Sequence, residues 1–242
     1  MKSIALRLVL LLASLLLGAC LSGREEFWFE SNGSGRLQAE YRLPAFAITS
    51  LGGEEKLRKT IADYFAKEPG VVLEEFSIEK NRSEARLRLS VTFDSVLQLA
   101  QLLDQAEKKD GPSEPSLPEP MVKLLGEVKV QRSGMNVDFQ RIIDPREVFA
   151  GGLVSPSAQQ MKGYQLEYIM HLPTVAKQSN AHQVLDGGRT LVWSYELAEA
   201  MKHPVQTNFV TPIPIPGWCW IVIAALVLGL VWLIRRRFKR RA

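Results

Sequence analysis

Short stretches of the chain alternate between apolar and polar residues, which predicts half-buried β-strands. Phe27 and Phe29 share one strand face, and apolar residues alternate from Leu37 to Leu43 until Pro44 ends the pattern. Between these stretches, Asn32-Gly33-Ser34-Gly35 is rich in turn-forming residues. We therefore expect a β-hairpin close to the N-terminus.

A second hairpin is expected on the same grounds, with a turn at Asn81 to Ser83. Val72, Phe76 and Ile78 form the apolar face of its first strand, and apolar residues alternate from Ala85 to Phe93 along its second strand. The opposite face carries charges of both signs, which predicts cross-strand pairing on a solvated surface. These charged residues are Glu75, Glu79, Arg86 and Arg88.

Apolar residues recur at helical spacing after each hairpin. One such stripe, over 57–65, is followed by Pro69-Gly70, which ends a helix. A second stripe, over 96–103, follows Asp94, a favourable residue for capping a helix N-terminus. The expected order of elements is therefore ββαββα.

The later part of the chain predicts further strands. Residues 108–120 are rich in proline and read as an exposed loop. A third hairpin is expected around Ser133-Gly134, and three more strands are expected over 164–172, 189–197 and 205–210. The predicted fold class is α+β, with antiparallel hairpins and two packed helices followed by these strands.

The N-terminus has the pattern of a bacterial signal peptide. Residues 1–19 combine a short basic start with the apolar run Leu8 to Leu17. Leu17-Gly18-Ala19-Cys20 resembles the lipobox, in which the cysteine is modified with acyl chains such as palmitate and becomes the new N-terminus. The alternative is ordinary signal-peptidase cleavage near Ala19, which would leave Cys20 as a free thiol.

The C-terminus has the pattern of a membrane span. Gly217 to Ile234 is an uncharged segment of 18 residues, about 27 Å long as a helix and close to the roughly 30 Å apolar core of a bilayer. The proline-rich spacer 212–216 precedes it, and a basic tail, 235–242, follows it. The alternative, a buried core helix, would leave the basic tail without a role. The cations of the tail are Arg235, Arg236, Arg237, Lys239, Arg240 and Arg241.

These cations predict the topology, because positive charge is retained on the cytoplasmic side. We therefore expect one C-terminal transmembrane helix with a cytoplasmic tail. The domain 20–211 is then extracytoplasmic, at the outer face of the bacterial cytoplasmic membrane. Cys20 would add a second, lipid anchor.

Most of the net charge of +4 lies at the two ends of the chain. Residues 1–20 and 217–242 hold eight basic residues and no acid, so the remainder has 22 basic against 26 acidic residues. A net negative domain lacks the general phosphate-binding field of a nucleic-acid-binding protein. Nucleic acid is therefore not an expected partner.

The sequence predicts no catalytic, metal or cofactor site. His171, His182 and His203 are 11 and 21 residues apart, so no two of them share a helical turn as a metal-binding pair would. The Gly-x-Ser-x-Gly elbow of a serine hydrolase does not occur. Glu25 and Glu26 are adjacent on a strand and therefore point to opposite faces. An enzyme is not expected.

Two tryptophans are informative. Trp193 shares a strand face with Leu191, which predicts packing in the core rather than an aromatic platform for a ligand. Trp28 alternates away from Phe27 and Phe29. It therefore either faces lipid headgroups or a partner, or is buried on a second sheet face, and the sequence leaves both open.

Several stretches together point to a family. The lipobox at Leu17 to Cys20, the turn at 32–35, Ser179-Asn180 and the stretch Asp186 to Trp193 precede the single span and its basic tail. In this combination the chain resembles the LppM-like domain lipoproteins of bacteria. The resemblance implies an envelope-associated α+β domain, with a concave sheet that accommodates lipid, and no established enzyme activity.

We therefore expect a non-enzymatic module, tethered to the membrane at both ends, that binds a membrane lipid or another component of the cell envelope. Two tethers in one bilayer give a high effective concentration of any membrane-bound ligand. The alternatives are a subunit of an envelope assembly with a membrane-protein partner and, from another class, an envelope hydrolase with an unusual site.

The lipobox makes a direct prediction. Cys20→Ala removes the residue that is modified, so the precursor is expected to stay uncleaved and heavier than the mature protein. Electrophoresis and intact-mass measurement of the membrane fraction check this outcome. Unchanged processing of the variant would contradict lipidation at Cys20.

Overall fold

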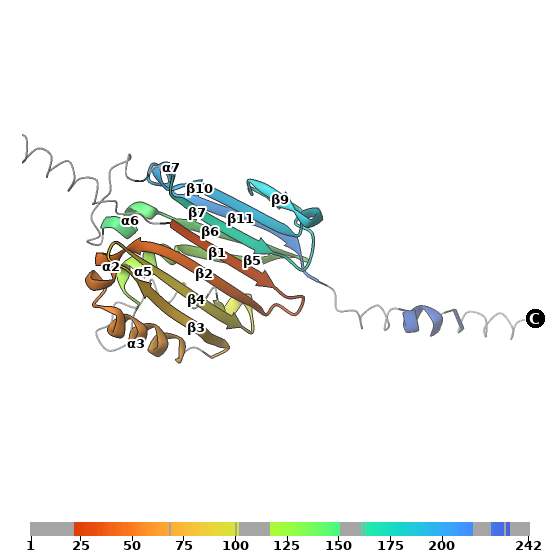
Figure 1. Cartoon of the computed structure of the whole chain (residues 1–242). Coiled ribbons are helices and arrows are strands. Elements are labelled where there is room, and N and C mark those ends of the chain that lie inside the picture. The colour runs from red at the N-terminus through yellow and green to blue at the C-terminus, as the bar shows by residue number, and fades with distance from the viewer. Residues whose placement is uncertain are drawn as a thin grey trace, which may run out of the picture.

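The computed structural model describes residues 22–67, 69–99, 101, 117–150, 161, 163–214, 224–229 and 231–232 of the chain. Within these residues, two β-sheets and several short helices form the domain (Figure 1). The predicted α+β class is confirmed.

The larger sheet has seven strands in the order β3-β4-β2-β1-β7-β10-β9. Neighbouring strands are antiparallel except β1 and β7, which are parallel. The strands are β1 (Ser22–Phe29), β2 (Gly35–Pro44), β3 (Val71–Lys80), β4 (Glu84–Phe93), β7 (Gln165–His171), β9 (Gln183–Leu185) and β10 (Thr190–Glu196).

The smaller sheet has four antiparallel strands in the order β5-β6-β11-β8. These are β5 (Glu127–Ser133), β6 (Asn136–Ile143), β8 (Gln178–Ser179) and β11 (Val205–Pro212). Asn180 links the two sheets, because its side-chain oxygen accepts hydrogen bonds from Trp193 Nε1 at 2.7 Å and from the backbone N–H of Asn208 at 2.9 Å. Trp193 is fully buried, as its strand pattern predicted.

Helices cover the part of the inner face of the larger sheet that the smaller sheet does not cover. They are α2 (Ala45–Ser50), α3 (Glu54–Phe65), α5 (Glu119–Leu125), α6 (Pro145–Ala150), α7 (Leu197–Ala200) and the 3₁₀ turn η1 (Asp186–Gly188). Helix α3 buries Leu57, Ile61 and Tyr64, which recur every three or four residues. The inner face of the larger sheet therefore packs against the smaller sheet on one side and against α3 and α5 on the other (Figure 1).

The chain enters and leaves the domain at opposite ends of its strands. Strand β1 has eight residues, from Ser22 to Phe29, a length of about 26 Å. Phe29, Leu172 and Pro212 line one hollow, so β1, β7 and β11 finish at the same end. We call this the exit end, because the chain leaves the domain there towards the C-terminus (Figure 1).

The first two predicted hairpins form as expected, but one strand face was assigned wrongly. The pairing register of β3 shifts between Leu73 and Glu75, where the strand contains a β-bulge. A bulge reverses the alternation of side chains, so Val71 is buried whereas Val72 is 55% exposed. Phe76 and Ile78, beyond the bulge, keep their predicted inward orientation.

The order ββαββα is not clearly shown. Two helices, α2 and α3, follow the first hairpin, and the helix after β4 is described only at residues 96–99 and 101. The proline-rich loop 108–120 lies outside the described residues up to 116, and its last two residues begin α5.

The predicted span 217–234 lies mostly outside the described residues, which include only 224–229 and 231–232 of it. In the described part of the chain, no helix has the length and apolar character needed to cross a membrane.

Gly35 makes a close backbone contact that the fold depends on. A Cβ at this position would lie 2.3 Å from the carbonyl oxygen of Trp28 and 2.5 Å from Cζ of Phe93. We expect Gly35→Ala to lower the free energy of unfolding by about 1–3 kcal/mol, because the first hairpin cannot absorb the methyl group without a shift. Urea unfolding followed by circular dichroism measures this, with the exposed Ser31→Ala as control. Equal stability of both variants would contradict the contact.

Candidate functional site

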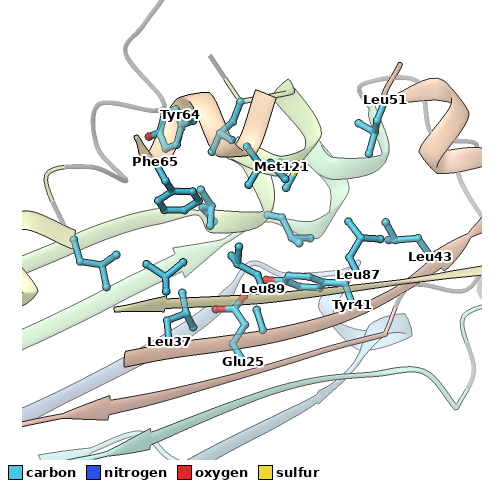
Figure 2. A pocket seen from close by; sticks show the side chains of 17 residues that line it. Glu25, Leu37, Tyr41, Leu43, Leu51, Tyr64, Phe65, Leu87, Leu89 and Met121 are labelled. Carbon is cyan, nitrogen blue, oxygen red and sulfur yellow. Dashed lines mark hydrogen bonds between the residues drawn. The ribbon is translucent and has the colours of Figure 1, made fainter. Parts of the chain in front are cut away.

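An apolar cavity of ≈ 80 Å³ lies between the larger sheet and the helices that cover it. Strands β2 and β4 form its floor, with side chains such as Leu37, Leu87 and Leu89, and α3 and α5 form its roof (Figure 2). From the roof, Phe65 and Met121 point down towards the sheet. We call this space the inner cavity.

Glu25 is the charged residue among those lining the inner cavity. It is 2% exposed, because it faces inward from β1, whereas the adjacent Glu26 faces outward as predicted. The hydroxyl of Tyr41 donates a hydrogen bond to Glu25 Oε1 at the floor of the cavity (Figure 2). A charged group inside an apolar wall requires a partner, because burial without one is costly.

That partner is Arg141 on β6, which is also 2% exposed. Arg141 Nη2 donates to Glu25 Oε1 at 3.1 Å, and Nη1 donates to Glu25 Oε2. The paired N–H donors of the guanidinium group match the two oxygens of the carboxylate. This Glu25–Arg141 pair therefore joins the larger sheet to the smaller one across the core.

Arg141 also binds the C-terminal end of α5. Its Nε donates to the carbonyl oxygen of Leu125 at 2.7 Å, and Nη2 donates to that of Leu124 at 3.3 Å. The last carbonyls of a helix lack partners within the helix, and a cation there also interacts favourably with the helix dipole. One side chain thus connects β1, β6 and α5.

Burial shifts the ionisation of the groups around this pair. Burial disfavours the charge of Arg141, but the carboxylate of Glu25 outweighs it and raises the pKa of Arg141 above its ordinary value. Burial and the negative charge of Glu25 raise the pKa of Tyr41 and of Tyr168, whose ring lies 5.3 Å from the guanidinium carbon of Arg141. Both phenols are therefore neutral hydrogen-bonding or packing groups rather than proton carriers.

The inner cavity is the first of three apolar spaces in a row. A narrow space of ≈ 20 Å³, the junction, shares Glu25, Leu37 and Leu125 with the inner cavity. A hollow of ≈ 200 Å³ at the exit end shares Phe29 and Phe139 with the junction. We call it the exit hollow. The three spaces share wall residues and follow one another from beneath α3 and α5 to the exit end, and we call them together the apolar seam.

The outer face of the larger sheet carries a chain of polar contacts around His171. Its Nε2 lies 2.8 Å from Glu26 Oε1, and its Nδ1 lies 3.1 Å from Thr190 Oγ1. Thr190 in turn donates to Asp186 Oδ2 at 2.6 Å. Burial favours the neutral acid of Glu26, but hydrogen bonds from His171 and Arg24 outweigh it and lower the pKa of Glu26.

Trp28 lies on this outer face between the side chains of His171 and Arg36. Its ring stacks on His171 at a centroid distance of 5.2 Å, and the guanidinium carbon of Arg36 lies 4.3 Å from the ring centroid. Trp28 is partly buried. The structure therefore shows neither a fully exposed tryptophan nor one buried beneath a second layer, and its neighbours are residues of its own sheet face.

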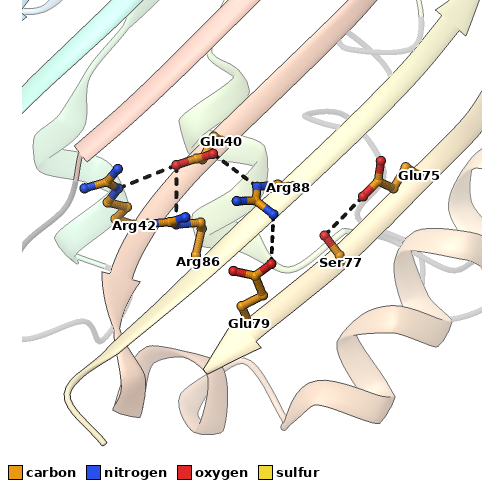
Figure 3. A network of polar contacts seen from close by, with 7 residues as sticks. All are labelled: Glu40, Arg42, Glu75, Ser77, Glu79, Arg86 and Arg88. Atoms are coloured by element: carbon orange, nitrogen blue, oxygen red, sulfur yellow. Dashed lines mark hydrogen bonds and ion pairs between the residues drawn. The ribbon is translucent and has the colours of Figure 1, made fainter. Parts of the chain in front are cut away.

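Of the predicted charge pairing across β3 and β4, the Glu79–Arg88 pair is present on the same face, whereas Glu75 accepts a hydrogen bond from Ser77 (Figure 3). Arg88 binds Glu79 at 2.8 Å, and both Arg88 and Arg86 reach Glu40 on β2 at 3.2 and 3.4 Å. These side chains are exposed or partly exposed, so each pair contributes little to stability. The sequence pattern did not indicate Glu40 as a member of this network. Glu40 reaches the arginines because β2 pairs with β4.

The structure does not describe most of the site residues that were assigned from the sequence. Cys20 and the six basic residues of the tail are outside the described residues. His182 accepts a hydrogen bond from the backbone N–H of Ser194 and packs against Tyr195, away from the contacts of His171. In the described part of the chain, no group of three His, Cys, Asp or Glu side chains is arranged to hold a metal ion.

The sequence analysis missed the Glu25–Arg141 pair and the cavity above it. A charged residue at an inward position of an apolar strand was the available signal, since Glu25 alternates with Phe27 and Phe29. Arg141 has the same relation to Phe139 and Ile143 on β6. Taken alone, each charged residue would only interrupt the apolar face of its own strand. Their role becomes clear only when the two strands are known to face each other.

No protein-family model matches the chain, and no curated protein matches its sequence. Among solved structures, the folded domain of the Mycobacterium tuberculosis LppM protein, determined by NMR, is similar with a TM-score of 0.43 and 10% identity, over 81% of this chain and 91% of that one. The Fcho1 Mu homology domain of Danio rerio with a bound Eps15 peptide is similar with a TM-score of 0.28 and 13% identity, over 81% and 78%. The resemblance to the LppM domain is diffuse.

The buried pair predicts strongly non-additive mutations. Glu25→Gln or Arg141→Met alone leaves one buried charge without its partner, so each is expected to lower the free energy of unfolding by about 3–5 kcal/mol. The double variant should lose less than the sum of both, because no unpaired charge remains. Denaturant titrations of the three variants measure this, with Glu40→Gln, at a partly exposed glutamate on the outer face, as a control that changes stability by less than about 1 kcal/mol. Additive losses would contradict the coupling.

Proposed function

We propose that the protein is a non-enzymatic module of the bacterial cell envelope that is tethered to the membrane and binds a lipid or another apolar envelope component. The observation that carries this proposal is the apolar seam. Its inner cavity is walled by aliphatic and aromatic side chains, with Glu25 at its floor, and the partner of Glu25, Arg141, lines the adjoining junction. An apolar pocket with a few convergent polar groups has the composition of a ligand-binding site.

The size of the inner cavity indicates how a ligand enters. At ≈ 80 Å³ it is smaller than a dry cavity of about 150 Å³ that holds a benzene ring. A longer apolar ligand therefore requires part of the wall to move. Helix α5 is the favoured part, because none of its residues is fully buried. Arg141 binds its C-terminal carbonyls and Lys123 pairs with Glu147 on α6 at 3.0 Å, so opening of the wall requires one of these contacts to break.

The position of the chain ends supports attachment to a membrane along the domain. Only Leu21 separates Cys20 from the start of β1, and the C-terminal segment leaves from the exit end. A lipid on Cys20 and a span at 217–234 would thus attach opposite ends of the strands to one bilayer. Both tethers keep the seam close to membrane lipids, which raises their effective concentration.

An enzyme is the weaker proposal. His171 contacts both Glu26 and the hydroxyl of Thr190, as a catalytic base would contact its orienting carboxylate and a nucleophile. Thr190 is buried, however, and its hydroxyl donates to Asp186. A nucleophile needs access to substrate and a free proton path to its base. A subunit of an envelope assembly is the other alternative, and a stable protein partner copurifying in place of lipid would favour it.

Filling the inner cavity tests the lipid-binding proposal. Ala39 is buried on β2 and lines the cavity. We expect Ala39→Leu to weaken lipid binding about tenfold, because overpacking of about 1–3 kcal/mol opposes the ligand. Native mass spectrometry of the full-length protein, released gently from membranes, measures the fraction that carries a lipid-sized mass.

Ala198→Leu is the matched control, because Ala198 lies on α7 and outside the lining of the cavity. Unfolding midpoints show whether both variants remain folded. A wild-type protein without any bound lipid, or an Ala39→Leu variant that keeps its adduct, would contradict the proposal.

A further inference from the structure

Exposed apolar side chains gather at one end of the domain. Among the described residues of 22–214, seven large apolar side chains are classed as exposed. Phe46, at the start of α2, is the one that lies at the entry end of the strands. The other six lie at or beside the exit end: Val72, Leu97, Met135, Val175, Val184 and Leu185. We call these six residues the exit rim.

Strand register and hydrogen bonds place these residues. Val72 pairs with Thr92, next to the last residue of β4, and Leu185 pairs with Thr190, the first residue of β10. Met135 lies in the turn between β5 and β6, and its carbonyl oxygen accepts a hydrogen bond from Ile213 at 2.8 Å. Val175 follows Thr174, which hydrogen-bonds to Thr211 and Pro212. Segments distant in sequence thus meet at one end.

The exit rim adjoins a hollow with the same chemistry. The exit hollow, ≈ 200 Å³, is lined by Phe29, Val96, Phe139 and Phe209 together with Ile213 and Pro214. An exposed apolar rim beside an apolar hollow is unusual on the surface of a soluble domain, where such residues are scattered singly. A neighbouring apolar phase or partner would remove both from water.

The length of the chain beyond the domain identifies that neighbour. Pro214 lines the exit hollow, and the uncharged segment begins at Gly217. Three residues of extended chain span at most about 11 Å. If 217–234 crosses the bilayer, the exit end cannot stand further than this from the membrane surface, whatever the orientation of the rest of the domain.

We propose that the exit end docks onto the outer leaflet of the bilayer, with the exit rim in the interface and the exit hollow open to phospholipid acyl chains. The proposal rests on the membrane attachment proposed above. At the entry end, only the acyl chains on Cys20 would contact the bilayer. At the exit end, the exit hollow would open directly to membrane lipid.

Charges near the exit rim are of both signs. Arg132 and Lys177 lie near Met135 and Val175, and the acids Glu30 and Asp94 are exposed at the same end. Docking is therefore driven by burial of apolar surface rather than by net charge. It is expected to change little between low and high ionic strength, unlike the binding of a basic patch to anionic headgroups.

Photolabelling from within the bilayer tests the docking. Full-length protein is reconstituted in phosphatidylcholine vesicles that contain a phospholipid with a diazirine on its acyl chain, illuminated, and mapped by peptide mass spectrometry. We expect labels on 217–234 and on peptides that carry Leu97, Met135 and Val175. Little label is expected on the peptide that carries Phe46.

Two variants make the test specific. Met135→Asp together with Val175→Asp changes exposed turn positions and is expected to lower labelling of the exit rim about tenfold, because a carboxylate at the interface opposes insertion. Phe46→Asp is the matched control and should leave the labelling unchanged. Ala39→Leu should also leave it unchanged, which separates docking from ligand binding in the inner cavity.

Any other result of the photolabelling experiment would contradict one step of the proposal. Labels on 217–234 with equal labelling of Phe46 and the exit rim would show that the domain does not dock through its exit end. An absence of label on 217–234 would show that the membrane attachment itself is wrong. Labelling of the exit rim that survives the double aspartate variant would show that these side chains do not enter the acyl layer.

Discussion

The ion pair between Glu25 and Arg141 is the constraint on which the rest of the domain depends. It lies where the larger sheet, the smaller sheet and the end of α5 meet, and both side chains are excluded from water. A buried charge without a partner costs several kcal/mol. The two sheets and α5 must therefore take up one relative position, the one in which Arg141 satisfies the carboxylate and the helix carbonyls together. Glu25 of this pair also lines the floor of the otherwise apolar inner cavity.

The larger sheet has two chemically different faces because its side chains alternate. Glu25 turns inward to the seam, and its neighbour Glu26 turns outward to His171 and Arg24. The inner face is apolar and shielded by α3, α5 and the smaller sheet, which suits an apolar ligand. The outer face is a network of arginine and glutamate side chains in water (Figure 3). A polar outer face keeps the sheet soluble while the exit end remains apolar.

The proposed functions share one axis along the strands. The seam begins beneath α3 and α5, passes the Glu25–Arg141 pair and widens at the exit end, beside the last residues of β11. The chain leaves the domain there towards its uncharged C-terminal segment. The proposed membrane contact and the C-terminal tether would thereby lie at one end of the molecule.

The sequence by itself determined most of the local elements of the domain. Alternation and helical spacing located most of the hairpins and α3, because a period of two or 3.6 residues is a property of neighbouring residues. The β-bulge at Leu73 and Glu75 broke that period and misplaced Val72. Only the tertiary structure decided which strands lie side by side, and hence that Glu25 meets Arg141, 116 residues away. It also decided that scattered residues such as Val72, Met135 and Val175 form one rim. Such contacts arise from the packing of two sheets, which no local periodicity records.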